Sequence, residues 1–500
     1  MFRKILLCFC FYLNILYSYG QVRINEFMQS NIDCIMDDLY EFPDSWVELY
    51  NQSDQDINID GWHISLKKNY TKGWRLSGNT NIPAKGYLLI YCDKVGKGLH
   101  TNFRLETTKE SNIYLFNEQG ALVDKVEGIP EQPNPNISMG ITSDNSLKYF
   151  IYSTPGKENS ECAATKLTQA PKFSKKAGVY NSAIELELAD EQSVPNSKIY
   201  YTLDGSEPNS ESDIYTTPLI IEKSTVVRAK IIADGYLIPR ATINTYIISD
   251  RDIALPIVSL SLDNKYLWDD MIGIYTEGHN GRAGCGSDEK FNYFQDWRRP
   301  VFFEYFPNQE SEKVLSQLGE LRIGGNCSRS NSIKTFIVYS NKRFGTKHFS
   351  YPFFQNDDKR DVIIKSFMLR NAGNDFSAGY LNDAWVQSMM AGKVDIDYQA
   401  YQPTVIFVNG EYWGIINIRE RSEEDFVYGN YKELENIDMI ENWTELKVGD
   451  IEAYNVLMSG RLIRDIKTSH KTELISLFKK GVYIIKMSNK YYKETRKIIL

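Results

Sequence analysis

Histidine and cysteine are scarce in this sequence. Its 500 residues include five histidines and seven cysteines, which leaves little material for histidine-based metal or acid–base sites. The cysteines are scattered and show no Cys-x-x-Cys spacing, so neither a zinc site nor a dense disulfide framework is expected, whereas one isolated disulfide stays open. An excess of basic charge is also lacking, because 65 acidic residues outnumber 57 basic ones and the net charge is −8. This argues against a general nucleic-acid binder, which would carry a basic surface.

Long apolar runs are missing beyond the first twenty residues. The run at residues 5–16 follows Arg3 and Lys4 and precedes small residues before Gln21. This layout is typical of a secretory signal peptide over residues 1–20, and the alternative is an N-terminal core helix. No later stretch approaches the ~18 apolar residues of a membrane span. We therefore expect an exported mature chain without a transmembrane segment.

Apolar and aromatic residues, by contrast, are plentiful. Hydrophobic residues make up 42% and aromatic residues 13%, with 33 tyrosines, which excludes a disordered or collagen-like chain. At roughly 150 residues per domain, the length allows about three domains. We predict a multidomain fold in which two all-β sandwiches precede an α+β domain and a short C-terminal β segment.

Residues 22–157 alternate short apolar runs with turn clusters, a pattern that predicts a β-sandwich. Four strings are distinctive: VRINEF at 22–27, WVELYN at 46–51, IDGW at 59–62 and IPAKGY at 82–87. Together they resemble the bacterial lamin-tail domain family, which implies an immunoglobulin-like accessory module. Within them, Glu26 and Glu48 could bind a hard cation. Hydrogen bonds that pin the strand ends are the favoured interpretation, because no loop rich in Asp or Asn accompanies them.

Residues 155–170 are polar and rich in chain breakers, so we predict a linker there. Residues 171–248 form a second β segment with the strings IYYTLDGSEP and TVVRAKIIADG. These strings resemble the small sandwich at the C-terminus of chitobiases and hexosaminidases, here without a glycosidase domain. Asp204 and Glu207 are interpreted as turn-forming residues and not as a catalytic carboxylate pair.

Residues 255–458 mix strand-like runs with helical spacing at 380–391, which is an α+β pattern. Asn409–Gly410 predicts a tight hairpin turn. Three strings stand out: LPIVSL at 255–260, LRIGGNCSR at 321–329 with KTF at 334–336, and NGEYWGI at 409–415 running into RER at 419–421. They resemble the CotH family of spore-coat-type protein kinases. The resemblance implies an atypical kinase-like fold that transfers phosphate from ATP to protein Ser or Thr.

Candidate site residues follow from the needs of phosphoryl transfer, which requires cations around the nucleotide phosphates and carboxylates around Mg²⁺. Arg322, Arg329 and Lys334 could hold nucleotide phosphates, and Lys334 could pair with Glu420 as kinase Lys–Glu pairs do. The alternative is a surface salt bridge beside an ordinary strand turn, because Gly324–Gly325 is not a P-loop. ATP and Mg²⁺ are expected as cofactors only if the kinase-like domain is functional.

The catalytic half of the CotH pattern is not found in this sequence. In the family, the catalytic base and the metal-binding Asp residues follow the Arg-Glu-Arg element in Asn/Asp-Trp-type and Asp-x-Asp-type strings. The aspartates after Glu420 lie outside any such string: Asp425, Asp438, Asp450 and Asp465. We therefore assign no catalytic or metal-binding residue and regard the domain as incomplete, through natural loss or a deletion in the gene model. Without these carboxylates phosphoryl transfer loses its electrostatic stabilisation, so we predict no or very low kinase activity.

Residues 459–500 change character and end in an alternating basic tail. The string GVYIIKM at 481–487 resembles the second half of a type IX secretion sorting domain. This resemblance implies a Bacteroidetes-type bacterium and passage through the outer membrane. The alternative is an ordinary terminal hairpin.

Two functions fit the whole sequence. The first is a secreted or cell-surface CotH-family protein with an inactive kinase-like domain and β-sandwich accessory modules. The second is a surface adhesion or binding protein whose aromatic-rich modules take a glycan, cell-wall or protein ligand. A glycosidase is disfavoured, because no paired-carboxylate cleft is identified.

Overall fold

The computed structural model describes residues 20–455 and the backbone of three later strands. Gaps within the first range fall at residues 79, 133, 143–145, 160–165, 309–312, 355–362, 378, 395–396, 432–433, 435, 442–444 and 453. The later strands are β32 (Thr472–Ser476), β33 (Val482–Ser488) and β34 (Lys493–Ile499). The predicted signal peptide, apart from Gly20, therefore lies outside the described residues, as do residues 456–471.

The described part of the chain is mostly β structure, as predicted. Its α-helices are α2 (Lys265–Trp268), α3 (Asn382–Met390) and α4 (Glu424–Asn430). None of the helices in the described ranges is long and apolar enough to span a bilayer.

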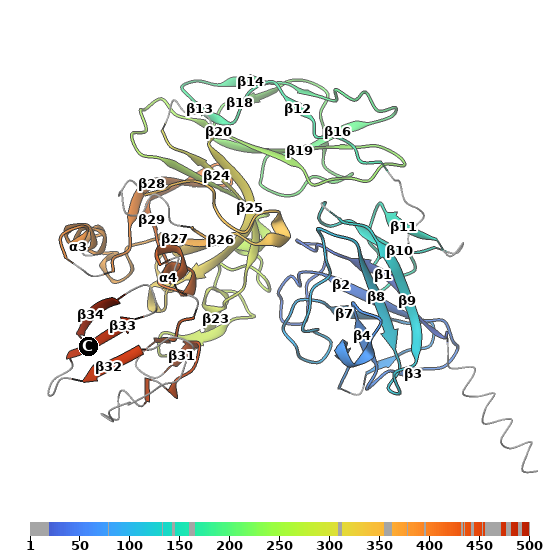
Figure 1. Cartoon of the computed structure of the whole chain (residues 1–500). Helices are drawn as coiled ribbons and strands as arrows, with labels where there is room; N and C mark the ends of the chain where they lie inside the picture. Colours follow the sequence, from blue (N-terminus) through green and yellow to red (C-terminus); the bar gives the residue numbers. More distant parts are fainter. Residues whose placement is uncertain are drawn as a thin grey trace, which may run out of the picture. The chain divides into compact units, whose positions relative to one another are not determined.

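The N-terminal part is a sandwich of two antiparallel sheets. One sheet has the order β11 (Leu147–Phe150), β10 (Ser138–Ile141), β1 (Val22–Met28), β2 (Trp46–Asn51), β7 (Tyr87–Tyr91). The other has the order β5 (Trp74–Arg75), β4 (His63–Ser65), β8 (Ser111–Phe116), β9 (Leu122–Ile129), with β3 (Ile57–Asn58) and β6 (Asn81–Ile82) as a separate pair. Figure 1 shows β8 and β9 of this second sheet running side by side. Buried residues such as Ile24, Val47 and Leu115 fill the space between the sheets, as the alternating pattern predicts.

The second part is a smaller β module. Its main sheet has the order β13 (Gly178–Tyr180), β20 (Thr242–Ile248), β19 (Thr225–Ile232), β16 (Lys198–Thr202), β17 (Asp213–Ile214). Two short pairs complete it, β14 (Ile184–Leu186) with β18 (Leu219–Ile221) and β12 (Lys172–Phe173) with β15 (Leu188–Ala189). Its core includes Leu186, Val227 and Tyr246.

The third part is a closed barrel of seven strands. Their order is β21 (Ile257–Ser261), β24 (Arg299–Phe306), β25 (Leu315–Gly324), β26 (Thr335–Tyr339), β27 (Ser366–Arg370), β29 (Glu411–Arg419), β28 (Tyr401–Val408). The parallel pair of β21 with β28 closes the ring, which removes free sheet edges. Aromatic rings fill the interior, with Phe303 5.4 Å and Phe349 4.8 Å from Phe367 between ring centroids. The α+β pattern of this region is thus realised as a barrel with short helices around it.

Residues Ser422–Leu500 form a separate compact unit. It contains α4, the hairpin of β30 (Met439–Glu441) and β31 (Glu445–Val448), and an antiparallel sheet of β32, β33 and β34. The string at 481–487 that resembles a sorting domain overlaps β33 from Val482 onward.

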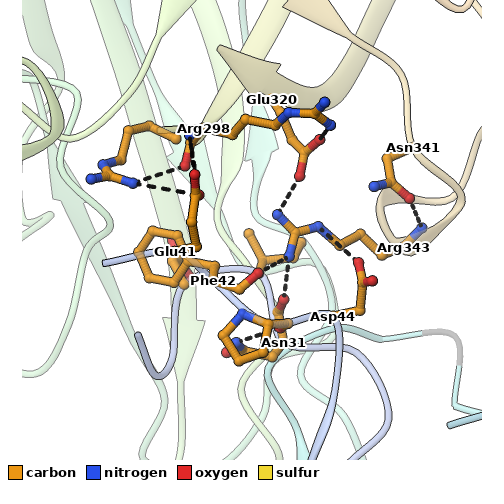
Figure 2. A network of polar contacts seen from close by, with 12 residues as sticks. Asn31, Glu41, Phe42, Asp44, Arg298, Glu320, Asn341 and Arg343 are labelled. Atoms are coloured by element: carbon orange, nitrogen blue, oxygen red, sulfur yellow. Dashed lines mark hydrogen bonds and ion pairs between the residues drawn. The ribbon is translucent and has the colours of Figure 1, made fainter. Parts of the chain in front are cut away.

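The loop between β1 and β2 packs against the barrel. Arg343 Nη1 donates to the carbonyl oxygens of Asn31 and Phe42 at 3.2 and 2.8 Å, and its guanidinium pairs with Glu320 (Figure 2). Both side chains of this ion pair are 6% exposed. The other end of the guanidinium faces Asp44 at 3.7 Å. These contacts fasten the N-terminal sandwich to the barrel.

Candidate functional site

The candidate phosphate-binding cations come from the turn between β25 and β26. Arg322 lies near the end of β25, and Arg329 lies in the short 3-10 helix η3 (Cys327–Ser330). Gly325 has a φ of 94°, and a Cβ there would lie 2.3 Å from the Ser328 hydroxyl oxygen. The positive φ at this position favours glycine, because a side chain there would strain the backbone.

The Asp296 carboxylate pairs with three arginines, two from this part of the chain and Arg282 from an earlier segment. Its Oδ1 lies 2.8 Å from Arg329 Nη2 and 3.3 Å from Arg322 Nη1, and its Oδ2 lies 2.6 Å from Arg282 Nη2. The antiparallel register of β24 and β25 brings the chain before β24 level with the end of β25. Partial burial opposes ionisation, but the hydrogen bond from Arg329 and the two other arginines hold the pKa of Asp296 below its ordinary value.

The Arg329 guanidinium is bound by protein oxygens on every side that carries a donor. Nε donates to the Gly325 carbonyl at 2.7 Å. Nη1 donates to the carbonyls of Phe294 and Gln295 at 2.8 and 3.0 Å. With Nη2 on Asp296 and the side chain 8% exposed, this arginine stabilises the turn from inside. A phosphate group would have to compete with all of these acceptors.

Lys334 is similarly engaged. Its Nζ donates to the carbonyl oxygens of Arg329 and Asn331 at 2.7 and 3.1 Å and lies 4.1 Å from the centroid of the Tyr293 ring. The residue is 5% exposed. Burial lowers the pKa of Lys334 to about 8, since desolvation disfavours the charged ammonium.

The structure does not bring Lys334 and Glu420 together. In the barrel, Phe336 of β26 pairs with Leu369, which pairs with Ile418 of β29. Lys334 and Glu420 are displaced in opposite directions from this row, about 13 Å apart along the strands and two strands apart across the sheet. The Glu420 carboxylate instead accepts the backbone N–H of Ala400 at 2.8 Å.

The neighbouring Arg419 of the Arg-Glu-Arg element has a structural partner of its own. Arg419 Nη1 lies 3.0 Å from the Asp383 carboxylate on α3, which also accepts from Arg370 Nε at 2.6 Å. Of the cations and the glutamate predicted for the site, only Arg322, Arg329 and Lys334 lie in one place. A role in binding nucleotide phosphates remains a prediction for all four residues.

The aspartates that follow the Arg-Glu-Arg element belong to the separate C-terminal unit. Asp425 lies in α4, and the Asp438 carboxylate accepts the backbone N–H of Asp450 at 2.9 Å. Asp465 lies outside the described residues. Among the described residues, side chains with metal-ligating atoms gather at Asp37, Asp93 and His100, in the N-terminal sandwich. There His100 Nδ1 and the Asp93 carboxylate are hydrogen-bonded at 2.6 Å.

Glu26 and Glu48 pin a later segment of the chain by hydrogen bonds, which is the interpretation favoured from the sequence. They face each other across β1 and β2. The Glu26 carboxylate accepts the backbone N–H of Thr154 at 3.1 Å. Glu48 accepts from the Asn25 side chain at 2.8 Å and from the backbone N–H of Gly156. Burial raises the pKa of both carboxyls, that of Glu48 to about 7.

A disulfide and a groove were not predictable from residue spacing. Cys285 and Cys327 form a disulfide, the isolated bridge that the sequence left open. It joins η3 to the hairpin of β22 (Arg282–Gly284) and β23 (Ser287–Phe291). A groove of about 1810 Å³ lies between the second β module and the barrel and is lined in part by Trp268, Tyr412 and Trp413. Its lining comes from six separate chain segments, which no local motif reveals.

Three family models match parts of the chain. They are Lamin Tail Domain over residues 17–129, Chitobiase/beta-hexosaminidase C-terminal domain over residues 175–242, and CotH kinase protein over residues 321–475. No curated protein matches the chain. The CotH match begins in β25 and runs past Met458, into the segment that resembles a sorting domain. The chain thus combines a region of the CotH kinase family with two accessory modules, of the lamin-tail and the chitobiase C-terminal families.

Proposed function

We propose that the chain is an exported CotH-family protein whose kinase-like barrel binds a ligand and does not transfer phosphate. One observation carries this proposal: Arg329 and Lys334 already give their hydrogen-bond donors to protein oxygens. Arg322 and Arg329 pair with Asp296, and Lys334 donates to two backbone carbonyls. The residues present therefore do not fit a nucleoside triphosphate with Mg²⁺.

A phosphotransfer assay tests the missing activity. The full chain is incubated with γ-labelled ATP, Mg²⁺ and casein, so that label on casein, on the chain itself and in free phosphate are all measured. We expect no label above a protein-free control. Turnover that a single Asp or Glu substitution abolishes, for example Asp296→Asn or Asp383→Asn, would contradict the proposal.

Export is supported by the Cys285–Cys327 disulfide, because disulfides persist in oxidising compartments and are rare in the cytosol. The proposal places cleavage of the signal peptide after residue 20. N-terminal sequencing of the protein recovered outside the cytoplasm should begin at Gln21. Recovery of a chain that still starts at Met1 would refute this step.

Passage through the outer membrane is proposed for the C-terminal segment. The resemblance of residues 459–500 to a type IX sorting domain supports it. In a type IX-competent host, deletion of residues 459–500 should leave the protein in the periplasm, whereas the full chain reaches the surface. Equal surface exposure of both forms would show that this segment is not the sorting signal.

Ligand binding at the cell surface is favoured by the groove between the second β module and the barrel. Large concave sites with aromatic walls and a few polar groups are the usual form of ligand sites. A glycan, a cell-wall polymer or a protein segment are the ligand classes predicted from the sequence. A thermal shift of the full chain with polysaccharide, but not with ATP and Mg²⁺, would support binding over phosphoryl transfer.

A further inference from the structure

The groove is built by two modules that share a core. Ile247 of β20 packs with Ile257 and Phe407 of the barrel in one buried cluster. The tip of the β28–β29 hairpin abuts the second module so closely that a Cβ on Gly410 would lie 2.8 Å from the Ser224 carbonyl oxygen. Asn409 at this tip accepts the backbone N–H of Leu262 at 2.9 Å. The walls of the groove are therefore fixed before any ligand arrives.

Aromatic side chains form one wall. Trp268 is 49% exposed and Tyr412 is 63% exposed, although tryptophan and tyrosine in a monomer are usually better covered. The Trp413 ring lies 6.2 Å from the Trp268 ring between centroids. Its indole N–H donates to the Tyr275 hydroxyl at 3.3 Å. Flat apolar rings are thus held open to the groove.

Carboxylates outnumber cations among the charged side chains that line the groove. The exposed acidic residues along it are Asp204, Glu211, Asp213, Glu222, Asp252 and Glu411, against the basic residues Lys223 and Arg251. Ionised carboxylates only accept hydrogen bonds. They match a ligand rich in hydroxyl donors and repel one that carries negative charge.

We infer that this groove binds a neutral oligosaccharide, whose sugar rings stack on Trp268 and Tyr412 while its hydroxyl groups donate to the lining carboxylates. The apolar C–H faces of pyranose rings suit flat aromatic walls. The volume of about 1810 Å³ exceeds the 300–1,000 Å³ of typical small-molecule sites, so several sugar units fit. The inference deepens the proposed ligand-binding function and rests on it.

Isothermal titration calorimetry on the full chain tests this inference. The probes are four neutral hexasaccharides, built from glucose, mannose, xylose and N-acetylglucosamine, with polygalacturonate as the acidic probe and oligolysine as the basic peptide. We expect at least one neutral hexasaccharide to bind with a Kd below about 1 mM. Binding should be insensitive to salt, because no charge pair is formed with the ligand.

Matched variants locate the binding. Trp268→Ala and Tyr412→Ala should each raise the Kd of the neutral hexasaccharide at least tenfold. Trp385→Ala removes a tryptophan that is 62% exposed on α3, outside the groove, and should leave the Kd unchanged. Circular dichroism confirms that each variant is folded.

The inference fails if no neutral hexasaccharide binds, if both groove variants bind like the unaltered chain, or if polygalacturonate or oligolysine is the tighter ligand. The phosphotransfer assay reports separately on the proposed loss of catalysis, because it does not involve the groove. A chain that neither phosphorylates nor binds sugars would refute the groove assignment alone.

Discussion

Asp296 is the residue on which the charged turn of the barrel depends. Three guanidinium groups converge on its carboxylate, from Arg282, Arg322 and Arg329. Without it, three like charges would face one another with no counter-charge between them. The residue therefore acts as a structural anion in the place where a substrate phosphate was expected.

Asp296→Asn should destabilise the chain by about 1 kcal/mol, a modest figure because the carboxylate is 43% exposed and exposed pairs are screened by solvent. The pKa of Asp296 is lowered in the folded state, so its contribution is present above its ordinary pKa and is lost as the pH falls. Urea unfolding at neutral pH and at low pH measures both effects. Asp270→Asn, at a side chain that is 60% exposed, serves as the control. Equal stability of the Asp296 variant and the unaltered chain at neutral pH would argue against the role of this carboxylate.

Glu48 predicts a pH dependence of the opposite sign. Its folded pKa is raised to about 7 by burial, with hydrogen bonds opposing the shift. The folded state therefore binds more protons than the unfolded state between about pH 4.5 and pH 7, and stability falls as the pH rises through this window. Glu48→Gln should flatten the slope of unfolding free energy against pH. Glu187→Gln, at an exposed site, should not. If the slope of unfolding free energy against pH were unchanged in Glu48→Gln, the prediction would be wrong.

At the scale of single residues, the sequence predicted correctly which cationic side chains lie near one another. It did not predict which groups these side chains bind. Arg329 and Lys334 lie in the turn between β25 and β26, and Arg322 lies in β25 just before it. Their partners were not predictable. Asp296 comes from before β24, and the acceptors of Lys334 are backbone carbonyls that leave no signature in side-chain types. The pairing of Lys334 with Glu420 fails because strand register separates them.

At the scale of elements, the β22–β23 hairpin is tied to η3 by the Cys285–Cys327 disulfide. The bridge closes a loop with a sequence separation of 42, which should contribute about 2–4 kcal/mol by restricting the unfolded chain. Dithiothreitol should therefore lower the melting temperature and speed proteolysis within the hairpin. Cys34→Ser should respond to dithiothreitol like the unaltered chain, since Cys34 is a free thiol, whereas a Cys285→Ser, Cys327→Ser double variant should not respond. A response retained by the double variant would exclude this bridge as its cause.

Local patterns predicted most strands and turns correctly. Asn409–Gly410 forms the turn between β28 and β29, with φ values of 50° and 83°, because these residue types tolerate positive φ. The helix expected at 380–391 is α3. Its apolar residues mislead, however: only Ala384 is buried, while Trp385 and Met389 are largely exposed. Helical spacing predicts that these apolar residues share one face of the helix. It does not predict whether another element packs on that face.

At the scale of the whole molecule, the β1–β2 loop joins the N-terminal sandwich to the barrel. Arg343→Ala would remove the hydrogen bonds to the Asn31 and Phe42 carbonyls and leave Arg298 as the remaining cation beside the buried Glu320. The cost in stability should therefore stay below the roughly 3–5 kcal/mol of a buried charge left without any partner. Hydrogen exchange should increase across the β1–β2 loop. Arg104→Ala, which removes the other partner of Asp44 at a site 40% exposed, should have a smaller effect. Unchanged exchange in Arg343→Ala would mean that the contact does not fasten the loop.

The modules themselves were accessible from the sequence because each carries local strings that match a family. The contacts between modules were not. Arg343 and Phe42 are about 300 positions apart in the chain, and the groove draws on turns, a short helix and a hairpin from two modules. Such contacts depend on how the folded modules pack against one another. The alternation of apolar and polar residues and the spacing of motifs do not predict this packing.

The most direct measurement is the equilibrium binding of Mg²⁺–ATP to the full chain by calorimetry. With Arg322, Arg329 and Lys334 engaged by protein oxygens, we predict no saturable heat at millimolar nucleotide. Saturable binding that is lost in Lys334→Met but kept in Lys265→Met, at a lysine 53% exposed, would contradict the interpretation of the barrel as a scaffold without phosphate transfer.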